Sequence, residues 1–514
     1  KNSNMSEVAS RYVDAIISDI FGEVVGSIAN NLVTKGPSSL DMICKDIPLA
    51  KVTHSLQVLI QHNLVTFEKG SRGQAFYKFE LLNAFSIMRY PKYLYIVKTE
   101  LGDDAEVILE ALLQFGRLSL VSVLYKAACK LLETNEDSLN VFVPMLKKKF
   151  DLLCEKKFIQ RLPEVTVNAV PTFLDSSNIP FQKVVVDLGK LQDNVQTKTI
   201  PEESQGTDCV YWRVNISKFN ECIRNQMIVD AVSRRIDEKA GVIMKIYLQN
   251  ISEEYNTLNP VSGSVSVNTL IQALKKSNQE MSLSDLKDYN KLMEEDSARF
   301  ITKIGEEGGG SYVINILNIV TEIIWSTIDW IVQEKYGSKA ARIYRLIRSE
   351  GYVEQDLIQK KAMLLDKEAK LLTYTLLENS FLQLKEVRKS MANSGPFKNI
   401  YLFYINLPLT VRNLLELSYK SLANLINRNN DEINSNKRLL EKQQRTETIL
   451  QNLKDQGATS EQLQEVNGPS HLLTACFGSL SVEFSSLCDR PLAYGYIGFL
   501  YFFPMGVVIV HLPN

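Results

Sequence analysis

The most constraining feature of this sequence is a pattern that recurs four times: an amphipathic helix followed directly by two short segments of alternating apolar and polar residues. In the fourth copy the helix is predicted over residues 366–378 and the two segments over residues 381–384 and 400–405. A polar turn at residues 388–398, with a Gly-Pro breaker, separates the segments. Alternation with period two is typical of a β-hairpin with one buried face. The sequence therefore predicts a copied helix-and-hairpin module rather than one continuous sheet.

The same pattern is found three more times along the chain. The helices that precede the hairpins are predicted over residues 52–61, 141–155 and 283–295. The hairpins themselves are predicted over residues 62–67 with 75–79, 158–161 with 211–214, and 299–304 with 311–316. The second hairpin is interrupted by residues 163–208, which contain prolines and an acidic, Ser- and Gln-rich end. We expect this interruption to be a long loop or a disordered insertion.

Helices grouped before a hairpin follow the order of a winged helix-turn-helix domain. In the fourth copy three helices are predicted, over residues 338–349, 355–361 and 366–378. Further helices are predicted over residues 12–32, 222–239 and 317–333. After the first hairpin, the aromatic-rich residues 81–97, divided by Pro91, exceed what a minimal winged helix needs, which predicts an extended unit. The expected fold class is mainly α with small β-hairpins (α+β), in four tandem extended winged-helix domains plus a C-terminal coiled coil. The predicted domains are residues 1–100, 101–215, 216–316 and 317–408, then a coiled-coil helix at 409–466 and an atypical apolar tail at 467–514.

Residues 410–456 are predicted to form one long helix, because they contain neither Pro nor Gly. Two columns of residues recur there with heptad spacing and give a candidate coiled-coil seam: Leu415, Tyr419, Leu422, Ile426, Asn429, Ile433, Asn436 and Leu440. The asparagines weaken such a seam, although polar seam residues can fix register and partner choice. The alternative is a single long helix that packs on its own domain.

The tail departs from this pattern, since residues 492–512 carry no charge over a length that could cross a bilayer. Pro504 and Gly506 interrupt the stretch, and no basic cluster follows it, which argues against a membrane span. Three interpretations stay open: a membrane span, a buried hairpin, or a segment from an alternative or mistaken reading frame.

Composition and motifs argue against an enzyme. The net charge of -1 provides no overall field toward nucleic acid, so any DNA contact has to come from local patches. The seven cysteines form no CxxC pair and there are only four histidines, so no metal site is predicted. Nucleotide-binding, hydrolase and metalloprotease motifs are absent from the sequence. We therefore expect no catalytic residue, no cofactor and no small-molecule substrate.

Candidate DNA contacts are taken from basic and polar residues on the third helices, on the wings and on the helix that opens the fourth copy. They are Lys51, His54, Gln57, Gln61, Lys69, Arg72, Lys147, Lys148, Lys149, Arg342, Arg345, Arg348, Arg388 and Lys389. Third helices can enter a groove and wings can touch phosphates. Each candidate also has a plainer interpretation. The wing residues can belong to a solvated turn, the lysine run to a solvated helix face, and the arginines can pair with Glu350 or Glu354.

Several stretches of the chain resemble one known family. They are Phe21-Gly22-Glu23, Gln61-His62-Asn63-Leu64-Val65, Arg89-Tyr90-Pro91-Lys92-Tyr93, Tyr211-Trp212, the run from Gly308 to Asn315, the run from Gly337 to Ile343, the run from Lys420 to Ile426 and the run from Asn436 to Lys442. Over nearly all of residues 6–466 the chain is similar to the winged-helix subunit of RNA polymerase III that belongs to its trimeric initiation subcomplex. It is also similar to the large subunit of the general initiation factor E of polymerase II.

This resemblance implies a non-catalytic polymerase subunit in the nucleus, which acts in promoter recruitment, DNA binding and opening, and initiation at small non-coding RNA genes. The implied partners are two smaller subunits of the initiation subcomplex, the clamp of the largest subunit, promoter-bound initiation factors, and single- and double-stranded DNA. The alternative is a winged-helix scaffold that binds only proteins. One departure matters: the family's coiled coil turns back through a second helix, whereas residues 467–514 do not match that pattern.

Overall fold

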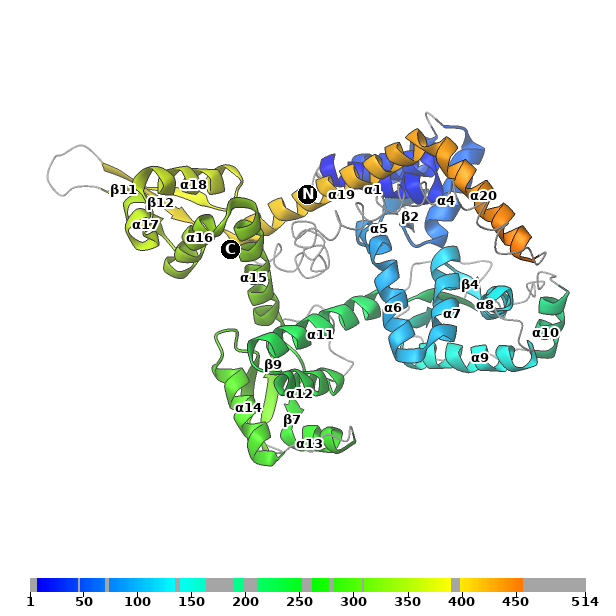
Figure 1. Ribbon diagram of the computed structural model, residues 1–514, viewed down its shortest axis with the longest axis horizontal. Helices are drawn as coiled ribbons and strands as arrows, with labels where there is room; N and C mark the ends of the chain where they lie inside the picture. Colours follow the sequence, from blue (N-terminus) through cyan, green and yellow to red (C-terminus); the bar gives the residue numbers. More distant parts are fainter. Residues whose placement is uncertain are drawn as a thin grey trace. The chain divides into compact units, whose positions relative to one another are not determined.

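A computed structural model describes residues 7–44, 47–69, 74–134, 139–162, 188–197, 210–251, 261–276, 282–306, 309–389 and 398–455. These residues are mainly helical and include four small three-stranded antiparallel sheets (Figure 1). The chain divides into two compact units, Lys1–Ile223 and Arg224–Asn514, and each contains two of the sheets. The fold is consistent with several winged-helix domains.

The first unit contains two copies of the predicted module. The helices of the first copy are α1 (Glu7–Phe21), α2 (Glu23–Lys35), α3 (Leu40–Ile43) and α4 (Leu49–Gln61), and its strands are β1 (Ser38–Ser39), β2 (Val65–Lys69) and β3 (Ala75–Phe79). Helix α5 (Leu81–Ser86) and a 3-10 turn, η1 (Ile87–Arg89), lead to the second copy. That copy comprises α6 (Tyr90–Leu101), α7 (Asp103–Phe115), β4 (Leu118–Ser119), α8 (Leu120–Thr134), α9 (Leu139–Glu155), β5 (Ile159–Arg161) and β6 (Tyr211–Val214).

The second unit contains the other two copies. The third is built from α11 (Ile216–Arg235), which begins in the first unit, α12 (Glu238–Gln249), β7 (Val265–Ser266), α13 (Val267–Lys276), α14 (Leu283–Glu295), β8 (Ile301–Gly305) and β9 (Ser311–Ile314). The fourth is built from α15 (Ile316–Tyr336), α16 (Ser338–Glu350), β10 (Val353–Glu354), α17 (Gln355–Ala362), α18 (Asp366–Glu378), β11 (Gln383–Lys389) and β12 (Lys398–Tyr404). In Figure 1, α16, α17 and α18 lie around the hairpin of β11 and β12. Helices α16 and α17 contact β12, and Tyr374 of α18 packs edge-on against Phe403 of β12.

Every sheet has the same topology. The second hairpin strand lies in the middle, between the first hairpin strand and a two-residue strand that comes earlier in the chain: the orders are β1-β3-β2, β4-β6-β5, β7-β9-β8 and β10-β12-β11. All four predicted hairpins are confirmed, including the one whose strands β5 and β6 are far apart in sequence. The short strands were missed, because two residues cannot display a period.

The third helices of the first, second and fourth copies end in the same tight turn. After α4, α9 and α18 one residue takes a left-handed conformation, with φ of 57° at Asn63, 60° at Lys157 and 60° at Ser380. The next amide nitrogen then bonds back to a carbonyl five residues earlier, at 2.9 Å from Leu64 to Leu59 and at 2.9 Å from Phe381 to Leu376. This is the Schellman ending of a helix, and it turns the chain directly into the first wing strand.

Two predicted helices are each divided in the structure. The helix predicted over residues 12–32 breaks at Gly22, whose φ of 95° is not helical. The helix predicted over residues 222–239 likewise ends at Arg235, and α12 begins at Glu238. The apolar residues keep their helical spacing through both breaks, so the sequence pattern does not reveal them. Gly102 and Gly337 occupy the corresponding positions of the second and fourth copies, with φ of 93° and 87°.

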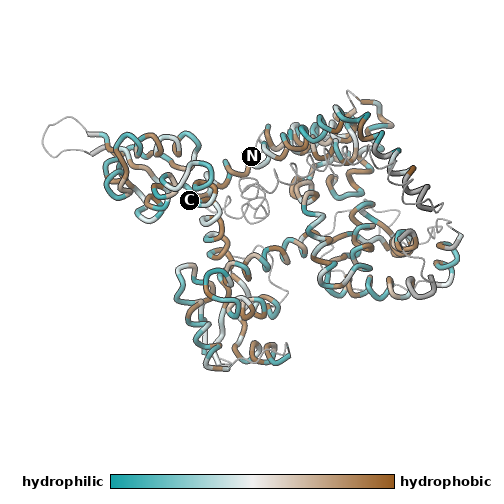
Figure 2. Tube along the Cα trace, in the orientation of Figure 1, coloured by the Kyte–Doolittle hydropathy of each residue, from teal (hydrophilic) through white to brown (hydrophobic). Residues whose placement is uncertain are grey.

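The core of each copy lies between its helices and one face of its hairpin. In the third copy, Leu286 and Met293 of α14 are buried in one cluster with Phe300, Ile301 and Tyr312 of the hairpin. Figure 2 shows hydrophobic and hydrophilic residues interleaved along the helices, as expected for elements with one buried face. Among the described residues, no helix combines the length and the apolar character that a membrane crossing requires.

The insertion predicted to be a long loop or disordered, residues 163–208, contains a helix, α10 (Leu188–Gln196). This helix packs on α8 and α9. Leu191 and Val195, each 2 % exposed, lie one helical turn apart on its buried side. The prediction was wrong here because so short an apolar spacing is inconspicuous within a polar segment. The rest of the insertion lies outside the described residues.

The single long helix predicted over residues 410–456 is two helices, α19 (Leu407–Ser435) and α20 (Lys437–Asp455). They are divided at Asn436, where φ is -102° and ψ is 13°, and the Asn436 side chain donates to the Glu432 carbonyl oxygen at 3.0 Å. Leu415, Tyr419 and Leu422 of the predicted seam are buried, whereas Ile433 is 45 % exposed. A coiled coil is therefore not shown by the described residues. The tail at 467–514 lies outside them.

The close approach between the first two copies predicts a stability effect at Gly116, which ends α7 with φ of 76°. A Cβ atom there would lie 2.5 Å from the Gln61 carbonyl oxygen, whereas a Cβ at Gly351, which ends α16 with φ of 79°, would meet nothing within 4 Å. We expect Gly351→Ala to cost about 1 kcal/mol through backbone strain alone. Gly116→Ala adds a backbone clash and should cost at least about 2 kcal/mol more.

Thermal unfolding of both variants, with hydrogen exchange of peptides from α4 and α7, checks this prediction. Equal destabilisation by the two substitutions would show that the contact between Gly116 and Gln61 does not hold the two copies together.

Candidate nucleic-acid interface

The third helix of each copy is the element that a winged helix-turn-helix domain places in a DNA groove, so its exposed face decides whether a copy suits DNA. Helix α4 carries Lys51, His54 and Gln57 on its exposed side and contains no Asp or Glu. Lysine pairs with phosphates, and glutamine can bond to adenine edges. The structure thus exposes these three residues together, and their contact with DNA stays a prediction.

Gln61, the fourth residue predicted on this face, is engaged within the first unit. Its side-chain nitrogen donates to the Phe115 carbonyl oxygen at 2.8 Å. Beside it, Asn63 Oδ1 accepts hydrogen bonds from Arg117 at 2.6 Å and from Arg213 at 3.2 Å. Burial, and then the charge of Arg213, lower the pKa of Arg117 to about 10. No sequence pattern marks this junction, because its members lie up to 150 residues apart.

The first wing is only partly described. Lys69 is the last residue of β2, where its backbone pairs with Ala75. Arg72 lies outside the described residues. Contact of these two wing residues with phosphates stays a prediction.

The lysine run on α9 does not act as one basic patch. Lys147 pairs with Asp151 at 2.9 Å, one turn further along the same helix. Lys149 donates to the Leu101 carbonyl oxygen at the end of α6, at 2.6 Å. A cation there is attracted to the negative end of the helix dipole. Lys148 is exposed. Two of the three lysines that were predicted to contact phosphates are therefore engaged in contacts within the first unit.

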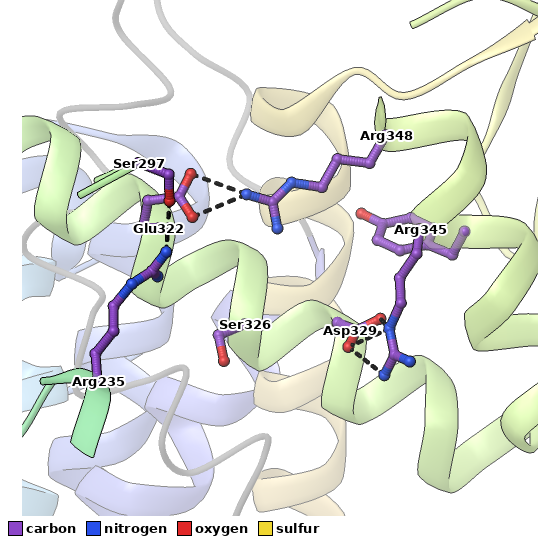
Figure 3. Close-up of a pocket in the computed structure, with 8 residues that line it drawn as sticks. Arg235, Ser297, Glu322, Ser326, Asp329, Arg345 and Arg348 are labelled. Carbon is purple, nitrogen blue, oxygen red and sulfur yellow. Dashed lines mark hydrogen bonds and ion pairs between the residues drawn. The ribbon is translucent and has the colours of Figure 1, made fainter. Parts of the chain in front are cut away.

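The arginines of α16 face carboxylates of α15. Arg345 binds Asp329 through two nitrogens, with distances of 2.7 to 2.9 Å, and Arg348 Nη2 lies 2.8 and 2.9 Å from the two carboxylate oxygens of Glu322. Such two-point pairs are strong and specific in geometry. The sequence predicts partners for these arginines among carboxylates close in sequence, whereas the observed partners lie on the preceding helix (Figure 3).

The partners that were expected for these arginines are used otherwise. Glu350 pairs with Lys361 at 2.7 Å, rather than with an arginine. Arg342 Nη1 donates to the Ala362 carbonyl oxygen at 3.2 Å, at the end of α17. The prediction that the α16 arginines pair with Glu350 is therefore wrong.

Arg388 and Lys389 belong to a strand and not to the turn in which they were placed. They pair with Asn399 and Lys398 in the ladder between β11 and β12, so the fourth wing is longer than predicted. Their backbone positions are defined, and their contact with DNA stays a prediction.

The third helices of the second unit have different surfaces. Helix α14 contains four carboxylates and two lysines, and it exposes Leu292. Helix α18 contains three carboxylates and two lysines, and its exposed side includes Leu371 at 67 % and Tyr374 at 56 %. Carboxylates are repelled by phosphates, and exposed apolar side chains gain nothing from a groove that is lined with phosphates. Neither helix has the surface of a DNA-reading helix.

The described residues contain no group of three or more His, Cys, Asp and Glu side chains placed to hold a metal ion.

Comparison with protein families gives four matches along the chain. The RNA polymerase III subunit RPC82 helix-turn-helix domain matches residues 11–70, and the family RNA polymerase III subunit RPC82 matches residues 165–323. The POLR3C C-terminal winged-helix domain matches residues 328–405. The helical hairpin domain of DNA-directed RNA polymerase III subunit RPC3 matches residues 438–469.

Similar full-length proteins carry one name. DNA-directed RNA polymerase III subunit RPC3 from Homo sapiens is 31 % identical, over 90 % of this chain and 91 % of its own length. The Bos taurus protein of the same name is 32 % identical over the same shares. The Dictyostelium discoideum protein is 20 % identical, over 83 % of this chain and 92 % of its own length.

The surroundings of His62 predict a pH dependence of stability. The ring packs against Phe21 with centroids 4.7 Å apart, and burial lowers the pKa of His62 to about 4. In the unfolded chain a histidine titrates near pH 6.5. Below that pH the unfolded state binds a proton that the folded state excludes, so stability is lost as the pH falls from about 6.5 to about 4, by up to roughly 3 kcal/mol.

His62→Gln should flatten the pH dependence of unfolding in that window, measured by urea denaturation at steps between pH 4 and pH 7. Gln57→Ala, on the exposed side of α4, which His62 directly follows, is the control and should keep the wild-type dependence. An unchanged slope in His62→Gln would contradict the prediction.

Proposed function

The chain belongs to the RPC3 (RPC82) family of RNA polymerase III subunits, and on this basis we propose that it contributes a DNA-binding surface, centred on α4, to the polymerase during initiation. Family membership makes it a non-catalytic accessory subunit with winged-helix domains that works in transcription. The proposed roles are recruitment to promoters, DNA binding and opening, and initiation at small non-coding RNA genes, in the nucleus.

The observation that carries this proposal is the difference among the four third helices. Among the four third helices, only α4 combines an exposed lysine with a complete lack of carboxylates, and its Gln57 is exposed as well. A lysine can hold the helix against the phosphates while the polar side chains contact base edges or an exposed strand. This division of roles requires no net positive charge on the whole chain.

The proposed partners are those implied by the polymerase III family: two smaller subunits of the initiation subcomplex, the clamp of the largest subunit, and promoter-bound initiation factors. The exposed apolar side chains of α18 support a protein partner for the fourth copy, since such surfaces mark protein contacts more often than nucleic-acid contacts. The second candidate function, a scaffold that binds only proteins, rests on the same α14 and α18 surfaces.

Binding of the full chain to labelled single- and double-stranded DNA over a range of salt concentrations tests the proposal. We expect Lys51→Ala to weaken binding and to reduce the slope of log affinity against log salt by about 1, because one phosphate contact is lost. Gln57→Ala should weaken binding by roughly tenfold with little change in slope.

Lys367→Ala is the matched control, because Lys367 is an exposed lysine on the third helix of the fourth copy. It should leave DNA binding unchanged. If Lys51→Ala and Lys367→Ala behave alike, or if the chain does not bind DNA at low salt, the protein-only scaffold is the better description.

A further inference from the structure

The first strand of each wing hairpin lies at an edge of its sheet, where a further strand could be added. Three of these edge strands are short, irregular or largely covered. Strand β5 has three residues, β8 has a register shift between Lys303 and Gly305, and β2 exposes only Glu68 among residues 65–68. Strand β11 differs, because its seven residues form an unbroken ladder with β12 and contain no proline. Among the described wing strands, β11 therefore gives the one long and regular edge.

The outer edge of β11 is open. Leu384, Lys385, Glu386 and Val387 are all exposed, although they point alternately to the two faces of the sheet. Within the described residues, the extensive contacts of β11 are those with β12. Figure 1 shows the far end of this hairpin extending beyond α17 and α18. Alternate residues of β11 therefore direct their backbone N–H and C=O groups away from β12, where these groups can pair with another chain.

The core face of the fourth sheet is incomplete at β11. Leu384 lies opposite Phe403, and Phe403 lies opposite Val353, so the three side chains share one face. Phe403 and Val353 are each 2 % exposed, whereas Leu384 is 43 % exposed. An apolar side chain on an added strand would lie beside Leu384 and remove it from water.

The charge of this wing favours an acidic segment. Residues 383–404 contain one acidic residue, Glu386, and four basic residues: Lys385, Arg388, Lys389 and Lys398. The third wing, over residues 301–314, contains one lysine and two glutamates instead. Lys385 lies on the face opposite to Leu384, and its ammonium is 5.2 Å from the centroid of the Tyr352 ring. A carboxylate beside Lys385 on an added strand would form a cross-strand ion pair.

We propose that the edge of β11 receives an extended segment of a partner protein as a fourth strand, and that this segment alternates acidic and apolar residues. Its carboxylates lie on the face of Lys385 and its apolar side chains lie beside Leu384, because successive side chains of a strand point to opposite faces. Backbone hydrogen bonds provide the affinity, and the alternation provides the specificity.

This inference deepens the protein contact proposed for the fourth copy and is independent of α4. A nucleic acid is attracted by the same basic residues, but a phosphodiester backbone neither continues a β-ladder nor covers Leu384. The open backbone edge and the incomplete core face are the observations that favour a peptide segment.

A fluorescein-labelled octapeptide of alternating aspartate and valine is the probe, because it spans the seven residues of β11. The control peptide has the same composition with its aspartates and valines in two separate blocks, so its charge is kept and the alternation is lost. We expect the full chain to bind the alternating peptide about tenfold more tightly than the block peptide. Binding should also slow hydrogen exchange in residues 383–389, whereas exchange in residues 301–305 of the third wing should not change.

Lys385→Glu and Lys360→Glu are matched variants, because both lysines are exposed and each change reverses one charge. Lys360 lies on α17, which contacts β10 and β12. We expect Lys385→Glu to weaken binding of the alternating peptide about tenfold, and Lys360→Glu to change it by less than about twofold. Lys51→Ala should bind the peptide as the wild type does, so this test stays separate from the test of DNA binding by α4.

The proposal would be overturned by a lack of binding, by equal binding of the block peptide, by equal effects of the two lysine variants, or by binding without slower exchange in β11. Slower exchange of β11 with a single-stranded oligonucleotide, but not with the alternating peptide, would also overturn it. The fourth wing would then be a nucleic-acid contact.

Discussion

The tight turn at the end of the third helix is the constraint on which the first, second and fourth copies depend. In the first, second and fourth copies a left-handed residue is followed by a large apolar side chain, Leu64, Phe158 or Phe381, each at most 2 % exposed. The amide nitrogen of this apolar residue donates a hydrogen bond back to the last turn of the helix, so the helix ends at the point where the wing begins. Helix and hairpin are therefore held at a fixed angle by the backbone, with the following apolar residue inserted in the core. A copy built in this way can change its outer surface without changing its fold.

Glycine would fit the left-handed position best, yet these copies use Asn63, Lys157 and Ser380. Asn63 shows one reason: its side chain joins Arg117 and Arg213 of the second copy. The backbone strain at that residue is offset by a junction that glycine could not form. In the second and third copies an asparagine directly follows the strand that closes the hairpin. Asn215 donates to the carbonyl oxygen of Lys157, and Asn315 donates to that of Arg299, which is also left-handed, with φ of 46°.

The sequence predicts the repeated part of this fold well, because alternating strands and amphipathic helices both carry a period. The third helices and all four hairpins follow from that signal, even where β5 and β6 are separated by the insertion. It fails where no period exists, as in the two-residue strands, and where periodicity continues through a break, as at Gly22. The candidate site was less predictable. Charge type is visible in a sequence, but the partner of Arg345, on a neighbouring helix, is set by packing.

The partners of the basic residues bear on the proposed DNA binding of this nearly neutral chain. Arginine or lysine that already faces a carboxylate, as Arg348 and Lys147 do, gains little from a phosphate, because the new contact replaces an existing one. Only a cation without such a competitor adds its full charge to binding. Helix α4 contains no carboxylate, so Lys51 has no such competitor on its own helix. The distribution of carboxylates, more than that of lysines and arginines, therefore separates a surface suited to DNA from surfaces suited to protein.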